Sequence, residues 1–237
     1  PITIDMSKIS PDRESFGLPP NKIFFIFSFD HNSNMSRKNP LAVIEAYRLA
    51  FGDRRDVGLV IKSLNSEQQP KRQAELNAAI KDLNAFIVDG ELERYQSFSL
   101  YAACDSYVSL HRAEGLGLAM AECMYMGKPV IATGYSGNME FMNHNNSLPV
   151  RYDMVQIQED QSVYRKGNWW AEPDIKHAAD CMQLLVNDSN LCKKMGERAK
   201  EHIQTHFSLE KSHQSIYERL NDIVSNQGKL WGFVATE

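Results

Sequence analysis

The sequence predicts an α/β protein, with a doubly wound parallel sheet of about six strands and extra helices at the C-terminus. Two observations predict this fold class. Short runs of β-branched and aromatic residues alternate with longer segments of helical spacing between residues 23 and 150, which is typical of βα units. After about residue 172 only helical spacing remains. We therefore expect helices on both faces of one sheet, followed by a helical tail.

Each element is expected from its own residues. The run IFFIFSF at 23–29 predicts a buried strand, and a helix begins at Asn39-Pro40, where a capping residue precedes proline at the first helical position. Further strands are expected at 57–61, 85–88, 106–110, 129–133 and 148–150. The helices between them are expected at 41–51, near 67–83, near 92–103 and near 117–126.

The rest of the chain is expected to contain no further strand. Residues 151–172 are the most polar stretch and are expected to be a long loop, anchored by Trp169 and Trp170. Three helices are then expected at 174–187, 189–204 and 208–226.

The composition excludes several classes of protein. The 237 residues, 43% of them hydrophobic, are enough to bury a core. A net charge of -4 argues against nucleic-acid binding by bulk electrostatics. No apolar run approaches the length of a membrane span, which is about 20 residues. The four cysteines form no CxxC pair and fit a reducing compartment, so we expect a cytoplasmic protein.

The chemistry is expected at the carboxyl ends of the strands, where open α/β sheets collect ligands. Glu114 follows the strand at 106–110, and the next residues include Gly115 and Gly117 at the start of a short helix. The bare N–H groups of such a helix start bind anions, and Glu122 lies near the middle of the helix. Two carboxylates, which accept hydrogen bonds from sugar hydroxyls, therefore flank a phosphate-sized pocket. This combination suits a nucleotide sugar.

The same segment, HRAEGLGLAMAECMYMGKPVIATGYSGNMEFM, resembles the signature of the retaining glycosyltransferases of family 4, in which seven residues separate two glutamates. Glu114 and Glu122 match this motif. The segments FDHNSNMSRKNPLAVIEAYRLAF (29–51) and WWAEPDIKHAADCMQLL (169–185) are similar to one bacterial branch of that family. The resemblance covers nearly the whole chain. It implies one Rossmann-like half of a GT-B fold and a role in bacterial polysaccharide or lipopolysaccharide assembly.

The resemblance also implies roles for individual residues. Glu114 would reach the donor sugar, and Glu122 would hold the ribose hydroxyls. The amides of Gly115, Leu116, Gly117 and Leu118 would face the diphosphate, whose charge Lys38 and Arg37 would neutralise. The family's usual Gly-Arg after the first strand is Phe29-Asp30 here. Arg37 or Lys62 is the candidate replacement for the absent arginine.

Other positions are open to two interpretations. Lys38 and Arg37 suit either a phosphate contact or an exposed basic pair, and Lys62 suits either a ligand contact or a snorkelling side chain. His111 would either contact the sugar or hydrogen-bond a loop carbonyl. The turn that contains Ser136, Gly137 and Asn138 would either face the sugar or phosphate with its amides or serve as a tight connection.

The expected reaction needs no cofactor. No Asp-x-Asp pair follows a strand, which favours fixed cations and amides over a metal for stabilising the leaving diphosphate. The donor would be a UDP- or GDP-linked sugar, with the base bound by backbone groups around 87–90. Two alternatives have a similar pocket: a nucleotide-sugar epimerase, for which we find no acid/base constellation, and a non-catalytic nucleotide-sugar-binding domain.

The expected organisation is that of half an enzyme. Residues 1–20 resemble an interdomain linker, 21–206 a nucleotide-sugar-binding domain, and 207–237 a helix and tail that pack toward a missing N-terminal domain. That domain would bind a glycan or lipid-linked acceptor, in an enzyme with peripheral contact to the inner face of the membrane. We expect the isolated chain to bind a donor without transferring its sugar, and the apolar residues of its last helix, Phe207, Leu209, Ile216 and Tyr217, to be partly exposed.

Overall fold

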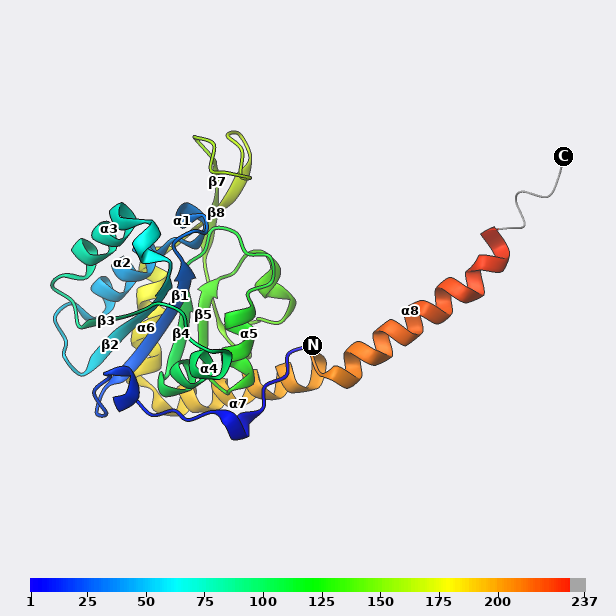
Figure 1. The fold of residues 1–237 in the computed structure, drawn as a ribbon, viewed down its shortest axis with the longest axis horizontal. Helices are drawn as coiled ribbons and strands as arrows, with labels where there is room; N and C mark the ends of the chain where they lie inside the picture. Colours follow the sequence, from blue (N-terminus) through cyan, green and yellow to red (C-terminus); the bar gives the residue numbers. More distant parts are fainter. Residues whose placement is uncertain (231–237) are drawn as a thin grey trace.

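A single parallel sheet organises the domain in the computed structural model, which describes residues 1–230 (Figure 1). The six strands lie in the order β3-β2-β1-β4-β5-β6. They are β1 (Ile23–Asp30), β2 (Val57–Leu64), β3 (Ala85–Asp89), β4 (Ser106–Ser109), β5 (Val130–Thr133) and β6 (Leu148–Val150). The order runs outward from β1 in both directions, so the predicted doubly wound parallel sheet is confirmed.

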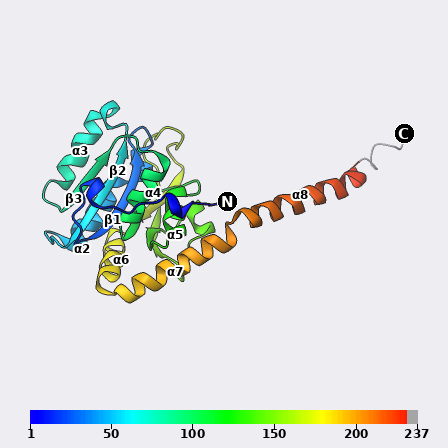
Figure 2. The same ribbon diagram turned by 60° about the horizontal axis from the view of Figure 1, so that its bottom comes forward.

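Helices cover both faces of this sheet (Figures 1 and 2). One face packs against α2 (Pro40–Phe51), α3 (Pro70–Ile80) and α6 (Ile175–Asn187), and the other against α4 (Arg94–Ala103), α5 (Leu118–Tyr125) and α7 (Ser189–His206). Successive residues of β1 enter opposite cores, with Phe25 in the first and Phe24 in the second. Both faces of this strand are therefore buried, which explains its continuous apolar sequence.

The expectation of a long loop at 151–172 is wrong. Two strands, β7 (Tyr152–Gln156) and β8 (Trp169–Pro173), form a separate antiparallel hairpin that projects from the domain (Figure 1). Most side chains of β7 are exposed, so its sequence carries no apolar run to mark it. Trp170 is buried, but Trp169 is 59% exposed and does not anchor this segment as expected.

The N-terminal residues pack on the domain. Ile2, Ile4 and Leu18 are buried in the same core as α4 and α5. The backbone N–H of Ile2 donates to the carbonyl of Phe207 over 2.8 Å. This contact joins the start of the chain to the end of α7.

The last described helix, α8 (Leu209–Leu230), extends away from the domain (Figures 1 and 2). Leu209, Ile216 and Tyr217 are exposed and Phe207 is half-buried, as expected. None of the helices among residues 1–230 combines the length and the apolar character that a membrane crossing requires. The part of the predicted tail at 231–237 lies outside the described residues.

Candidate functional site

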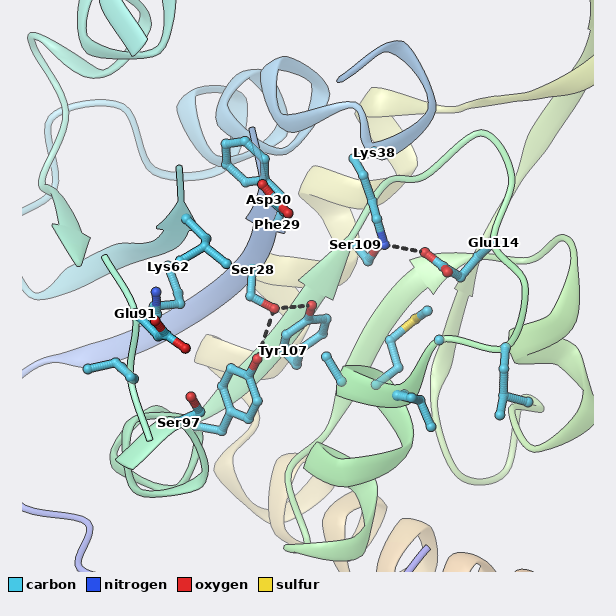
Figure 3. A pocket seen from close by; sticks show the side chains of 18 of the residues that line it. Ser28, Phe29, Asp30, Lys38, Lys62, Glu91, Ser97, Tyr107, Ser109 and Glu114 are labelled. Atoms are coloured by element: carbon cyan, nitrogen blue, oxygen red, sulfur yellow. Dashed lines mark hydrogen bonds and ion pairs between the residues drawn. The ribbon is translucent and has the colours of Figure 1, made fainter. Parts of the chain in front are cut away.

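A cavity of about 590 Å³ opens at the carboxyl ends of β1, β2 and β4 (Figure 3). Its position matches the rule that open α/β sheets bind ligands at this edge. The predicted site residues that line it are Lys38, Lys62, Glu114, Leu116, Gly117 and Leu118. The cavity therefore brings together the motif glutamate, two lysines and the start of α5.

Glu114 is held by two cations. One of its carboxylate oxygens lies 2.6 Å from Lys38 Nζ and 3.2 Å from Arg37 Nη1. Burial alone would raise the pKa of Glu114, but the hydrogen bond and charge of Lys38, together with the charge of Arg37, hold this pKa below its ordinary value. Glu114 is therefore ionised at neutral pH, and its charge is neutralised by Lys38 and Arg37, the two cations predicted to bind phosphate.

Both cations come from a single turn of helix, α1 (Met35–Lys38). Asn34 caps its start by accepting a hydrogen bond from the backbone N–H of Arg37, and Asn39 ends it in the left-handed conformation. The sequence identified the next helix but missed this turn. The turn α1 places Arg37 and Lys38 directly opposite the loop that follows β4.

Arg112, which was not predicted from the sequence, holds this turn against that loop. Its guanidinium donates to both carboxylate oxygens of Glu172, over 2.6 and 2.8 Å, and to the carbonyl of Ser36 over 2.7 Å. The same group lies over the ring of Trp170, 5.2 Å from its centroid. Arg112 thus links α1, the Glu114 loop and strand β8.

The turn at 136–138 supports the Glu114 loop from behind. The Ser136 hydroxyl donates to the carbonyl of Glu114 over 2.6 Å, and the backbone N–H of Gly137 donates to the same oxygen over 3.1 Å. A Cβ at Gly137 would overlap the carbonyl oxygen of Gly115. Ser136, Gly137 and the buried Asn138 do not line the cavity, so in this structure they serve as a connection that shapes the loop.

His111 is fully buried, and both its ring nitrogens have partners within the protein. Nδ1 lies 3.1 Å from the Ser109 hydroxyl, and Nε2 lies 3.1 Å from the carbonyl of Tyr135 and from Asn138 Oδ1. Burial lowers the pKa of His111. Of its two interpretations, the structure shows the hydrogen bond to a loop carbonyl.

Glu122 lies outside the cavity lining, on α5. Burial raises the pKa of its carboxyl to about 7, and the positive charge of Arg94 on α4 offsets this effect only in part. The structure therefore does not bring Glu122 into the same cavity as Glu114. Gly115 and Arg37 are likewise absent from the cavity lining.

Lys62 occupies the opposite side of the cavity. Its ammonium donates to the carbonyls of Ser63 and Gly90, and burial lowers its pKa. Sequence reasoning missed the hydroxyl groups between Lys62 and Glu114, those of Ser28, Tyr101 and Tyr107 (Figure 3). The available signal was Ser28, a polar residue near the end of the otherwise apolar strand β1.

Comparison with known proteins identifies a family. The family model described as "Glycosyl transferases group 1" matches residues 9–202. A trehalose synthase from Rubrobacter xylanophilus is 24% identical over 181 residues, which are 72% of this chain and 37% of that protein. The human alpha-1,3/1,6-mannosyltransferase ALG2 is 21% identical over 231 residues, 91% of this chain and 49% of that protein. The chain thus spans between a third and a half of these relatives.

Solved structures share the fold. Sucrose-phosphate synthase from Thermosynechococcus elongatus superposes with a TM-score of 0.70 at 16% identity, covering 95% of this chain and 52% of that one. The C-terminal domain of the group 1 glycosyl transferase LpcC from Francisella tularensis gives 0.67 at 20% identity, covering 87% of this chain and all (100%) of that domain. Anabaena HepE in complex with UDP-glucose gives 0.67 at 19% identity, covering 92% and 54%.

Proposed function

Because the chain belongs to the glycosyl transferases group 1 family, we propose that it is the donor-binding domain of a retaining, metal-independent glycosyltransferase of family 4 with a GT-B fold. The domain binds a nucleotide-diphosphate sugar at the carboxyl edge of its sheet. The reaction breaks the bond between the anomeric carbon of the donor sugar and the diphosphate. A new bond forms between that carbon and an acceptor hydroxyl oxygen.

The observation that carries this proposal is the cluster of Lys38, Arg37 and Glu114 at the start of α5. Breaking the sugar–phosphate bond releases a diphosphate whose charge must be stabilised as it grows. Lys38 Nζ, 2.6 Å from Glu114, is a cation that a diphosphate would recruit, and the amides of 115–118 add neutral donors. Release from Lys38 leaves Glu114 free to accept hydrogen bonds from the donor sugar.

Two further contacts of the donor are proposed, of which Glu122 comes from the family resemblance and lies outside the cavity lining. In the proposal Glu122 accepts hydrogen bonds from the ribose hydroxyls, and backbone groups around 87–90 hold the base. UDP and GDP are both candidate carriers, and UDP has direct support in one neighbour of the same fold, because Anabaena HepE was solved with UDP-glucose. A carboxyl whose pKa is about 7 would bind ribose best once ionised, since the carboxylate is the stronger acceptor.

The acceptor belongs to the part of the enzyme beyond this fold. The chain spans about half of the human relative, and residues 1–230 contain a single parallel sheet. We infer that a second, N-terminal domain binds a glycan or lipid-linked acceptor and that α8 packs toward it. The proposed setting is bacterial polysaccharide or lipopolysaccharide synthesis in the cytoplasm, at the inner face of the membrane.

Incubation with labelled UDP- and GDP-sugars tests this function. We expect the 237-residue chain to bind one class of donor without transferring the sugar, and the chain joined to its N-terminal domain to transfer it with retention. Isomerised donor sugar would instead identify an epimerase. Binding without transfer by the two-domain protein would identify a non-catalytic domain, and transfer by the isolated chain would refute the half-enzyme proposal.

A further inference from the structure

Three hydroxyl groups form a connected cluster on the floor of the cavity (Figure 3). Ser28 Oγ on β1 lies 2.9 Å from the Tyr107 hydroxyl on β4 and 3.0 Å from the Tyr101 hydroxyl on α4. All three residues line the cavity, but both tyrosines are buried, whereas the serine is only half-buried. Ser28 is therefore the member of the cluster best placed to meet a ligand.

The hydrogen atoms of this cluster can be assigned by counting. Three hydroxyls carry three protons, but two hydrogen bonds join them, so one proton is left over. A buried hydroxyl that leaves its proton unpaired is costly, so the two buried phenols donate theirs. Both bonds then run toward Ser28 Oγ, which accepts twice. The unused proton then belongs to Ser28, which lines the cavity.

Lys62 is the neighbour of Ser28 on the same face of the sheet. The two residues are register partners on the adjacent strands β1 and β2. Two of the three ammonium protons of Lys62 are used by the carbonyls of Ser63 and Gly90, which leaves one proton. The cavity thus offers two donors from adjacent strands, the Ser28 hydroxyl and the Lys62 ammonium, which lies toward Gly90.

We propose that Ser28, held by Tyr101 and Tyr107, donates its hydroxyl proton to a phosphate oxygen of the nucleotide diphosphate, and that the Lys62 ammonium donates to the same diphosphate. The identity of this ligand rests on the proposed function. Sugar hydroxyls need acceptors as well as donors, whereas this pair offers donors only and therefore suits a phosphate oxygen. The nearby Asp30 carboxylate is already engaged, because its Oδ1 accepts hydrogen bonds from Asn65 Nδ2 and from the backbone N–H of Asn32, both over 2.8 Å.

The first test is the affinity of UDP and GDP, measured by titration calorimetry on the 237-residue chain. The alanine variant Ser28→Ala loses a hydrogen bond to a charged group, so we expect affinity for the bound nucleotide to fall about ten- to hundredfold. Ser28→Thr keeps the hydroxyl and is expected to restore most of it. Ser99→Ala removes a hydroxyl of α4 outside this cavity and is the matched control, with unchanged affinity.

A second variant separates a direct contact from a structural one. Ser28→Ala leaves two buried phenols without their acceptor, whereas Ser28→Ala combined with Tyr101→Phe and Tyr107→Phe removes all three hydroxyls and leaves none unpaired. If Ser28 acts only by supporting the fold, this triple variant binds UDP or GDP like the wild type, and the proposal is overturned. If Ser28 touches the ligand, its affinity stays low.

Inorganic pyrophosphate identifies the part of the nucleotide that is bound. We expect the affinity for pyrophosphate, measured directly by the same titration, to fall in Ser28→Ala by the same factor as the affinity for the nucleotide. An unchanged affinity for pyrophosphate would overturn the phosphate assignment and place Ser28 against the nucleoside. Wild-type protein that bound pyrophosphate but neither UDP nor GDP would refute the proposed function and leave the phosphate contact of Ser28 supported.

Discussion

At the scale of single residues, the central feature is the ion pair of Glu114 with Lys38 and Arg37. In the proposed enzyme, the diphosphate competes with Glu114 for these two cations. Once the diphosphate has bound them, the Glu114 carboxylate is free to accept hydrogen bonds from the donor sugar. The proposal thus couples binding of the leaving group to exposure of a sugar-binding oxygen.

This coupling predicts the effect of Glu114→Gln. The amide has no charge to hold Lys38, so we expect UDP or GDP to bind at least as tightly as to the wild type, while sugar transfer by the two-domain enzyme falls sharply. Calorimetry and a transfer assay measure the two effects separately. A loss of nucleotide affinity of about tenfold would mean that Glu114 contacts the nucleotide itself.

Glu122 predicts a pH-dependent stability. Its pKa rises from 4.5 to about 7 on folding, so between these values the folded state binds more protons than the unfolded state, and stability falls as the pH rises. Glu122→Gln removes this penalty. We expect the variant to melt at a higher temperature than the wild type at a pH of about 8, and not at a pH of about 5. Equal differences at both pH values would show that Glu122 is not the titrating group.

At the scale of elements, the site is positioned by contacts between segments that are close in space but far apart in the sequence. Arg112 joins α1 to β8, and the turn at 136–138 carries the Glu114 loop. Neither contact is local in sequence, since Arg112 and Ser36 are 76 residues apart. Such contacts arise only when the sheet has brought its carboxyl edge together.

Arg112 is expected to affect nucleotide affinity indirectly, because it holds the turn α1 that carries Lys38. Removing the hydrogen bond to Ser36 frees α1, so Arg112→Ala is expected to weaken UDP or GDP binding about tenfold, with little further loss when combined with Lys38→Ala. Arg151→Ala is the control, because it breaks a more exposed arginine–carboxylate pair, with Asp174, away from α1. Fully additive losses would refute action through Lys38.

Two glycines make a matched test of the supporting turn. A Cβ at Gly137 would overlap the carbonyl oxygen of Gly115, and one at Gly196 would overlap that of Gly127. Both alanine variants are expected to lose about 1–3 kcal/mol of stability through overpacking, as measured by urea unfolding. We expect only Gly137→Ala also to weaken nucleotide binding, since Gly115 adjoins Glu114. Equal nucleotide affinity in both variants would separate this turn from the site.

The sequence was most informative where local pattern decides the structure. The strand at 23–29 was predicted from an apolar run, and the short helix with Glu122 follows the glycines at 115 and 117; the structure confirms both, as β1 and α5. The hairpin β7–β8 was missed because its first strand is exposed and carries no apolar run. The hydroxyl cluster was missed because Tyr107 reads as an ordinary core residue until Ser28, 79 residues away, lies beside it.

At the scale of the whole molecule, the candidate site lies at the carboxyl edge of the six-stranded parallel sheet. The groups proposed to bind the diphosphate come together at its carboxyl edge, from β1, β2, α1 and α5. Helix α8 follows the C-terminal end of α7 and extends away from the domain (Figure 2). Its exposed apolar residues include Ile216, Tyr217 and Leu220. In the proposed enzyme this helix packs toward the N-terminal domain, which binds the acceptor.

The most direct test of this account is a crystal structure of the chain with UDP or GDP. We expect the diphosphate at the start of α5, within hydrogen-bond distance of the amides of 115–118 and of Lys38, with Lys38 released from Glu114. The ribose hydroxyls should meet Glu122. A nucleotide bound elsewhere on the molecule, or a cavity that stays empty at saturating concentrations of both nucleotides, would contradict the assignment of a donor-binding domain.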